Sequence, residues 1–139
     1  MPGVIFRGDS FTGLFEPRDT ILFEHNMRHA GVLVKGDTLY VLWSRVGDTP
    51  ERILFSMVDL SSDDWNDWQA SEAVDVLASE FPWEGSEIEM LSSLRGEMPV
   101  ATHELRDPFI FEDTDKTLYL LFEKNCSVKD QTICERPLP

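Results

Sequence analysis

The chain has 139 residues, with 12 Lys plus Arg against 26 Asp plus Glu, and so carries a formal net charge of -14. This charge repels nucleic-acid phosphates and anionic lipid headgroups, so neither nucleic acid nor a membrane is expected as a partner. Hydrophobic residues make up 42% of the chain, which favours a single folded domain over a disordered chain. Carboxylates accept hydrogen bonds from hydroxyl groups, so a sugar ligand suits this composition, although acidity that serves only solubility is the alternative.

Targeting and redox signals are sparse. No apolar run approaches the length of a membrane span, and residues 1–10 lack an apolar segment behind a basic flank. A soluble protein is predicted, cytoplasmic by default because no export signal is visible. Cys126 and Cys134 match neither a zinc ribbon nor a C-x-x-C motif, so two reduced thiols are favoured over a disulfide, and neither a metal nor a cofactor is expected.

The first half of the chain predicts a three-stranded meander. Residues 31–34 and 38–43 form apolar runs joined by a Lys-Gly-Asp turn, and 53–60 form a third run. Residues 71–80 fit a strand or a short helical turn, and residues 81–98 fit a long loop. Long loops in compact domains are usually functional or mobile.

A similar pattern returns near the C-terminus, where runs at 108–111 and 117–122 flank an acidic turn. The second strands, starting at 38 and 117, are offset by 79 residues, and the first strands, starting at 31 and 108, by 77. Repeated meanders are typical of propeller blades. The predicted fold is therefore all-β, with β-propeller-type blades of antiparallel meanders, about two blades in an incomplete ring.

We expect one domain over 1–139. A first blade covers about 27–68, a connection about 69–102, the start of a second blade about 103–122, and an irregular tail 123–139. Open blade edges would favour self-association. Truncation relative to a longer propeller is the preferred explanation of the incomplete ring, and a ring completed by identical chains or a small sandwich are the alternatives.

Arg106-Asp107-Pro108 is the segment expected to contact a ligand. Asp107 stands at the entrance of an apolar strand, where propeller blades face their central channel. Pro108 favours an extended backbone before it, and the adjacent Arg106 would keep the carboxylate ionised. The alternative is an Asp-Pro strand start with Arg106 in a surface ion pair.

The segment His-Glu-Leu-Arg-Asp-Pro-Phe-Ile-Phe-Glu-Asp at 103–113, followed by the strand at 116–122, resembles the Arg-Asp-Pro blade of five-bladed β-propeller glycoside hydrolases. These include the arabinanase, β-xylosidase, invertase and levansucrase relatives. Residues 27–53 resemble a preceding blade in uncharacterised bacterial members. The resemblance covers about 25–122 and implies a carbohydrate-related protein. It assigns Asp107 to holding sugar hydroxyls and stabilising the transition state of glycoside hydrolysis, with Arg106 in support.

Hydrolysis of this kind needs two carboxyl groups that flank the scissile bond. At the position equivalent to Asp107 in the first repeat stand His29 and Ala30, so an acidic residue is absent there. Glu84, beside Trp83, is the best candidate general acid, because an aromatic neighbour can desolvate a carboxyl group and raise its pKa. A solvated turn residue is the simpler interpretation of Glu84.

Further substrate-binding candidates are Arg106 and four residues near the first blade: Arg28, His29, Glu51 and Arg52. A strand-start ion pair is the alternative for the last two. The main alternative to an enzyme is a non-catalytic carbohydrate-binding or structural propeller fragment. Convergence of Asp107 with Glu84 or Glu51 within roughly 5 to 10 Å would favour the enzyme.

Overall fold

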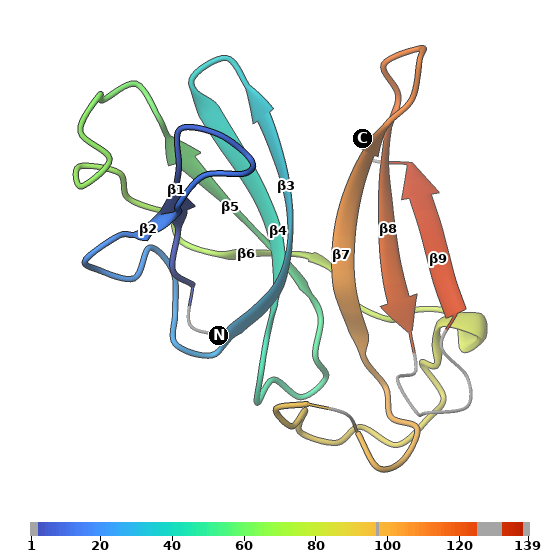
Figure 1. The fold of residues 1–139 in the computed structure, drawn as a ribbon. Helices are drawn as coiled ribbons and strands as arrows, with labels where there is room; N and C mark the ends of the chain where they lie inside the picture. Colours follow the sequence, from blue (N-terminus) through green and yellow to red (C-terminus); the bar gives the residue numbers. More distant parts are fainter. Residues whose placement is uncertain (1–2, 97, 125–131, 138–139) are drawn as a thin grey trace.

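The computed structural model describes residues 3–96, 98–124 and 132–137. Within these residues the regular structure is almost entirely β, in two larger antiparallel sheets and a short N-terminal hairpin. The two larger sheets stand side by side and do not close into a barrel (Figure 1). The predicted all-β fold of antiparallel meanders is confirmed.

The first sheet has the strand order β3-β4-β5-β6. Its strands are β3 (Met27–Lys35), β4 (Thr38–Arg45), β5 (Ile53–Asp59) and β6 (Val74–Leu77). Each strand pairs with its sequence neighbour, as in a meander. Because β6 falls inside the stretch expected to be a connection, the first meander extends past the boundary predicted at residue 68.

The second sheet has the order β7-β8-β9, with β7 (Leu105–Glu112), β8 (Leu118–Lys124) and β9 (Thr132–Pro137). The prediction of an irregular tail over 123–139 is wrong where β9 lies. This segment has little alternation of its own, and pairing with β8 supplies its backbone hydrogen bonds. Cys126, and with it the question of a disulfide, lies outside the described residues.

The remaining elements are short. β1 (Phe6–Arg7) and β2 (Glu16–Pro17) form the hairpin that lies beside the first sheet. A single turn of 3-10 helix, η1 (Pro82–Glu84), interrupts the long connection between the two larger sheets. No helix among the described residues is long and apolar enough to cross a membrane.

Alternation along β4 supplies two hydrophobic clusters. Val41 and Trp43 face the N-terminal segment, whereas Leu42 faces the second sheet. The cluster on the N-terminal side consists of Leu22, Met27, Leu39, Val41, Trp43, Leu54 and Val58. The cluster between the sheets consists of Leu42, Ile53, Leu77, Leu105, Ile110, Leu120 and Phe122. The central residues of β4 are therefore buried on both faces of the first sheet, and the cluster between the sheets fixes the first sheet against the second.

The inner strands β3 and β7 meet at Gly31. A Cβ atom at this position would lie 2.6 Å from the carbonyl oxygen of Pro108 and 2.9 Å from Cα of Phe109. Glycine is required because the backbone of β7 occupies the space of a side chain. This close approach brings together the starts of the two inner strands.

Candidate functional site

The two inner strands carry the same irregularity. In β3 the pairing jumps from Arg28 to Gly31, so two residues oppose one on β4, and in β7 it jumps from Arg106 to Phe109. The first residue after each arginine has a left-handed backbone, with φ of 47° at His29 and 48° at Asp107. Such β-bulges redirect side chains and are frequent beside functional sites. The sequence folds into the same bulge twice.

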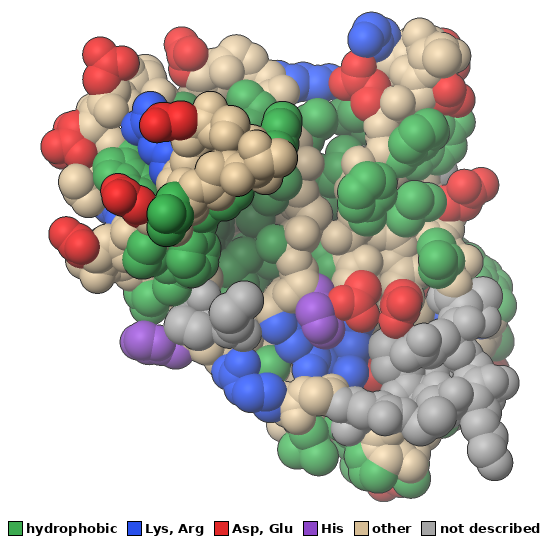
Figure 2. Space-filling view, in the orientation of Figure 1, with side chains coloured by type: hydrophobic (Ala, Val, Ile, Leu, Met, Phe, Trp, Pro, Cys, Tyr) green, Lys and Arg blue, Asp and Glu red, His purple; other side chains and the backbone are tan. Residues whose placement is uncertain are grey.

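The bulges place His29 and Asp107 in contact. Nδ1 of His29 lies 2.7 Å from Oδ1 of Asp107, and the two side chains are 39% and 36% exposed. They reach solvent at the junction of the sheets. On this face a histidine lies against acidic side chains, with basic side chains directly beneath (Figure 2).

Asp107 is ionised at neutral pH. Burial raises the pKa of its carboxyl group, but the hydrogen bond and charge of His29, a hydrogen bond shared with Glu123 and the charge of Arg28 outweigh burial and lower the pKa. A half-buried carboxylate on an inner strand can accept hydrogen bonds from a polar ligand.

Two pockets flank this pair. One, of about 210 Å³, is lined by Asp107, Phe109, Leu121, Phe122, Glu123 and Ile133. The other, of about 340 Å³, is lined by Arg28, His29, Arg95 and Gly96. The contact between His29 and Asp107 joins the two linings, so a ligand at the junction would meet an apolar and acidic wall on one side and a basic wall on the other.

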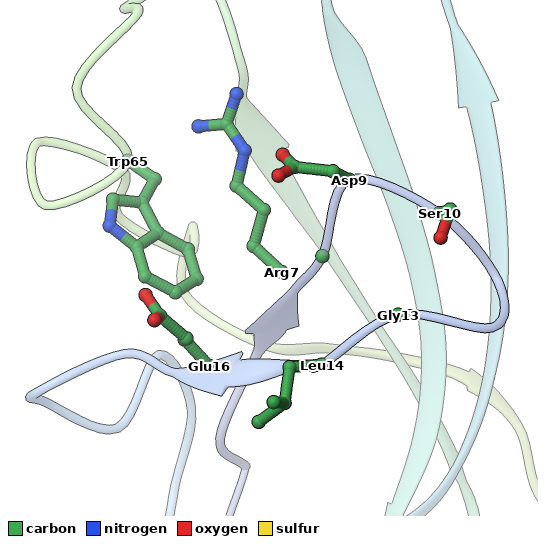
Figure 3. Close-up of a pocket in the computed structure, with 8 residues that line it drawn as sticks. Arg7, Asp9, Ser10, Gly13, Leu14, Glu16 and Trp65 are labelled. Carbon is green, nitrogen blue, oxygen red and sulfur yellow. The ribbon is translucent and has the colours of Figure 1, made fainter.

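A larger pocket, of about 530 Å³, lies away from this junction. Its wall is the loop that joins β1 to β2, with Trp65 facing it (Figure 3). Apart from Trp65 its lining residues are exposed, and none of the site residues expected from the sequence lies there. It is an open surface hollow, and we place the candidate site at the junction of the sheets.

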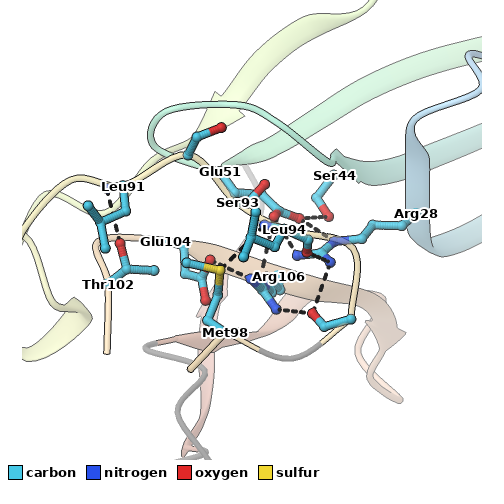
Figure 4. A network of polar contacts seen from close by, with 12 residues as sticks. Arg28, Ser44, Glu51, Leu91, Ser93, Leu94, Met98, Thr102, Glu104 and Arg106 are labelled. Atoms are coloured by element: carbon cyan, nitrogen blue, oxygen red, sulfur yellow. Dashed lines mark hydrogen bonds and ion pairs between the residues drawn. The ribbon is translucent and has the colours of Figure 1, made fainter. Parts of the chain in front are cut away.

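Beneath the junction lies a cluster of buried charges, which we call the charge cluster: Arg28, Glu51, Glu104 and Arg106. Arg28 binds Glu51 through two hydrogen bonds of 2.8 and 2.5 Å. Arg106 binds Glu104 at 2.6 Å and approaches Glu51 at 3.5 Å. Figure 4 shows the two arginines reaching Glu51 from different strands. Since both glutamates are fully buried, these pairings are needed to compensate their desolvation.

The charge cluster also fixes the backbone around it. Ser44 donates to Glu51 at 2.6 Å, and the amide of Leu105 donates to the carbonyl of Glu51 at 2.9 Å. Burial raises the pKa of Glu104, against the lowering effect of Arg106, and Oε1 of Glu104 has no hydrogen-bond partner among the described residues. The cluster is a structural support below the site.

This placement changes the roles expected for three residues. Arg28, Glu51 and Arg106, expected to bind substrate, are at most 7% exposed and engaged with one another. The expectation that Arg106 keeps Asp107 ionised is also corrected, because Arg106 pairs with Glu104 and the hydrogen-bonded partner is His29. In a propeller, polar residues at the start of a strand are expected to face the central channel. Only tertiary packing shows that the side chains of Arg28, Glu51 and Arg106 are instead buried in the protein.

Glu84 does not join Asp107. It is fully buried in η1, where its carboxylate accepts hydrogen bonds from the amides of Glu80 and Phe81 and pairs with Arg136 on β9 at 2.5 Å. Asp107 lies on β7, two strands away in the sheet order. Glu84 closes the helical turn and ties it to the outer strand, which is a structural role.

Arg52 lies apart from the junction, in ion pairs with Asp75 at 3.0 Å and Asp48 at 3.8 Å. Of the residues proposed from the sequence, His29 and Asp107 are thus brought together at the surface, and the other five are held elsewhere or below. Among the described residues no group of His, Cys, Asp and Glu is arranged to hold a metal ion.

Three residues at the junction were missed by the sequence reasoning: Phe109, Glu123 and Arg95. Phe109 and Glu123 carry no signal beyond strand alternation. Arg95 precedes Gly96, whose φ of 93° marks a tight turn, but a lone arginine in a long loop carries no motif. Only the approach of the loop to β3 identifies it.

The chain matches no known family model and no solved structure. An uncharacterised protein of Acanthamoeba polyphaga mimivirus is 36% identical over 107 residues, which are 76% of this chain and 26% of that protein. The chain thus matches about a quarter of the length of this curated relative. The resemblance to propeller glycoside hydrolases stays a prediction.

Proposed function

We propose that this chain binds a carbohydrate at the junction of its two sheets, with Asp107 accepting hydrogen bonds from sugar hydroxyls. The observation that carries the proposal is the position of Asp107: ionised, 36% exposed and held by a bulge at the start of an inner strand. The resemblance of its segment to the Arg-Asp-Pro blade of propeller glycoside hydrolases supports the same role.

The neighbours of Asp107 suit a sugar. Phe109 is 57% exposed and lines the same pocket, so it offers an apolar surface to the C–H face of a pyranose ring. Glu123 adds a second group that can accept a hydrogen bond from a hydroxyl. A hydroxyl-rich ring with one apolar face fits this combination.

Binding is better supported than hydrolysis. Paired carboxyl groups in glycosidases are separated by about 5 to 10 Å, so that a sugar and, in inverting enzymes, a water molecule fit between them. Glu84 and Glu51 are occupied in buried pairs, and Glu123 shares a hydrogen bond with Asp107, which is closer than that spacing. A non-catalytic carbohydrate-binding propeller fragment is therefore the proposed function.

The test is calorimetric titration and thermal shift with arabino-, xylo-, manno- and fructo-oligosaccharides. We expect one class to bind and to raise the Tm, and Asp107→Asn to weaken binding by about tenfold or more, since it removes charge-assisted hydrogen bonds. The matched control is Asp63→Asn, which changes an exposed aspartate in another loop.

Two outcomes would overturn the proposal. One is the absence of binding to every sugar by a correctly folded protein, and the other is unchanged affinity in Asp107→Asn. Release of reducing sugar that is abolished in Asp107→Asn would instead establish hydrolysis, with Asp107 in the role that the resemblance implies.

A further inference from the structure

We propose that the sugar bound at this junction carries a carboxylate group, as uronic acids do, and that Arg95 receives this group in the pocket beside His29. The inference rests on the proposed function and specifies its ligand class. It concerns the basic residues that line the pocket beside His29. Binding of neutral hydroxyls by Asp107 gives these residues no function.

The first observation is the character of the pocket. Of its four described lining residues, Arg28, His29 and Arg95 are basic and Gly96 has no side chain. This basic lining contrasts with the net charge of -14 that the whole chain carries. Basic side chains gathered under the junction are visible in Figure 2. Such a lining attracts an anion.

Arg28 is not the residue that receives the anion. Its Nε and NH2 groups donate to Glu51, and its NH1 group donates to the carbonyl of Leu94 at 2.8 Å. With every nitrogen engaged and only 7% of the residue exposed, its charge is already compensated inside the protein.

Arg95 has the opposite properties. It is exposed, it lines the pocket, and among the described residues its side chain donates one hydrogen bond, of 3.3 Å from NH2 to the carbonyl of His25. No ion pair joins it to a carboxylate within the part of the chain that the structure describes. A guanidinium group has five N–H donors in a planar fork that matches a carboxylate, so Arg95 retains the capacity for bidentate binding.

His29 supplies a second polar group. Its Nδ1 is occupied by Asp107, and within the described residues Nε2 has no hydrogen-bond partner. Because bonding at one ring nitrogen fixes the orientation of the imidazole, Nε2 is held as a fixed contact for a ligand. His29 therefore links the hydroxyl-binding side of the junction to the carboxylate-binding side.

The charge cluster holds this arrangement in place. Arg28 and Arg106 donate to the carbonyls of Leu94 and Gly96, on either side of Arg95, at distances between 2.8 and 3.4 Å. The same two arginines directly precede His29 and Asp107. The charge cluster thus holds the backbone beside His29, Arg95 and Asp107. Such preorganisation lowers the entropic cost of binding a ligand.

A sugar with a ring carboxylate uses both walls. Its hydroxyls and apolar face would contact Asp107 and Phe109, and its carboxylate would reach Arg95 across His29. A free small anion would lack the first set of contacts, and a neutral sugar would lack the second.

The experiment compares matched ligands by calorimetric titration of the whole chain. We expect oligogalacturonate or oligoglucuronate to bind about tenfold or more tightly than the neutral oligosaccharide or the uronate methyl ester, because charge-assisted bonds to the guanidinium are lost in the last two. Arg95→Gln should abolish this preference, so that the acidic and neutral sugars bind with similar affinity. Arg7→Gln, at an exposed arginine of the distant hairpin, should leave both affinities unchanged.

Each contrary result has a defined meaning. Equal binding of acidic and neutral sugars, or a preference that survives Arg95→Gln, would overturn the carboxylate assignment while leaving carbohydrate binding intact. Tighter binding of a sugar phosphate than of the uronate, or equal binding of acetate alone, would also overturn it. Failure of every sugar, acidic or neutral, would overturn the proposed function as well.

Discussion

His29 and Asp107 occupy the same place in two successive sheets, and they bond to each other across the junction. Each follows a buried arginine, each lies in a bulge of the inner strand, and each has a left-handed backbone. A repeated backbone feature has thus brought two different side chains within 2.7 Å. Repetition of the bulged inner strand positions the pair, and the difference between the two repeats makes the pair polar and asymmetric.

The stability contributed by Asp107 should depend on pH in the acidic range. Its pKa is lower in the folded chain than in the unfolded one, where it is about 3.9. The contribution is therefore present above that value and is lost as pH falls through the folded pKa. In urea denaturation, Asp107→Asn should be less stable than the wild type by about 1 kcal/mol or less at neutral pH, because solvent screens a partly exposed pair. The difference should shrink below about pH 4. A difference that grew on acidification would contradict this.

Glu51→Gln should destabilise the protein strongly. Glu51 neutralises Arg28 and approaches Arg106 in a fully buried setting, and removing one partner of a buried pair costs about 3 to 5 kcal/mol. Glu24→Gln breaks the more exposed pair with Arg45 and should cost less than about 1 kcal/mol. Denaturant unfolding of both variants measures the contrast, and equal losses would show that the charge cluster is not a support.

Gly31→Ala should destabilise the junction. The added methyl would meet the backbone of β7, which cannot move aside as a side chain can, and such overpacking costs about 1 to 3 kcal/mol. Val32→Ala, at a 57% exposed position on the same strand, is the control with little expected effect. If Gly31→Ala unfolds at the wild-type temperature, β3 and β7 are not in the contact described.

Glu84→Gln separates a structural role from a catalytic one. It removes the buried negative charge that pairs with Arg136 at 2.5 Å and weakens the acceptor of two amides, which should cost about 1 to 3 kcal/mol in stability. Sugar affinity should be unchanged. Glu87→Gln, an exposed glutamate nearby, should alter neither property. If the wild type releases reducing sugar, a folded Glu84→Gln protein that loses this activity while keeping its affinity would restore the general-acid hypothesis.

Self-association is expected at the open edge of the first sheet. Val74 and Val76 on β6 are 53% and 41% exposed on an outer strand, where unpaired backbone groups can pair with another chain. Light scattering should show a mass that rises with concentration, and Val76→Lys should shift the protein toward the monomer. A concentration-independent monomeric mass in the wild type would contradict this expectation.

Strand alternation and turn residues were enough to predict the central strands of both sheets. They failed for β9, whose residues 132–137 alternate poorly and depend on β8 for their pairing. They also left residues 71–80 undecided, where β6 forms by pairing with β5. Edge strands are specified largely by their neighbours, and this explains both outcomes.

The alignment of the repeats shows what a local pattern cannot resolve. The sequence aligned the first strands at an offset of 77 residues, so that both His29 and Ala30 stood near the position of Asp107. When the two bulges are superposed in sequence, Arg28 is equivalent to Arg106 and His29 is equivalent to Asp107. This alignment has an offset of 78 residues (107 minus 29). A one-residue change in register exchanges the side chains on the two faces of a strand, so the bulge decides which residue reaches the site.

Strand periodicity and turn chemistry are local properties, and they predict the all-β class and the repeated meander. The role expected for Asp107 comes from the resemblance to propeller glycoside hydrolases. Which charges are buried and which remain exposed depends on the packing of the whole folded chain. Arg28, Glu51 and Arg106 look like surface groups in the sequence but compensate one another inside the protein, whereas His29 and Asp107 are brought into contact from segments far apart in the chain. Desolvation and pairing depend on what the folded chain places around each charge.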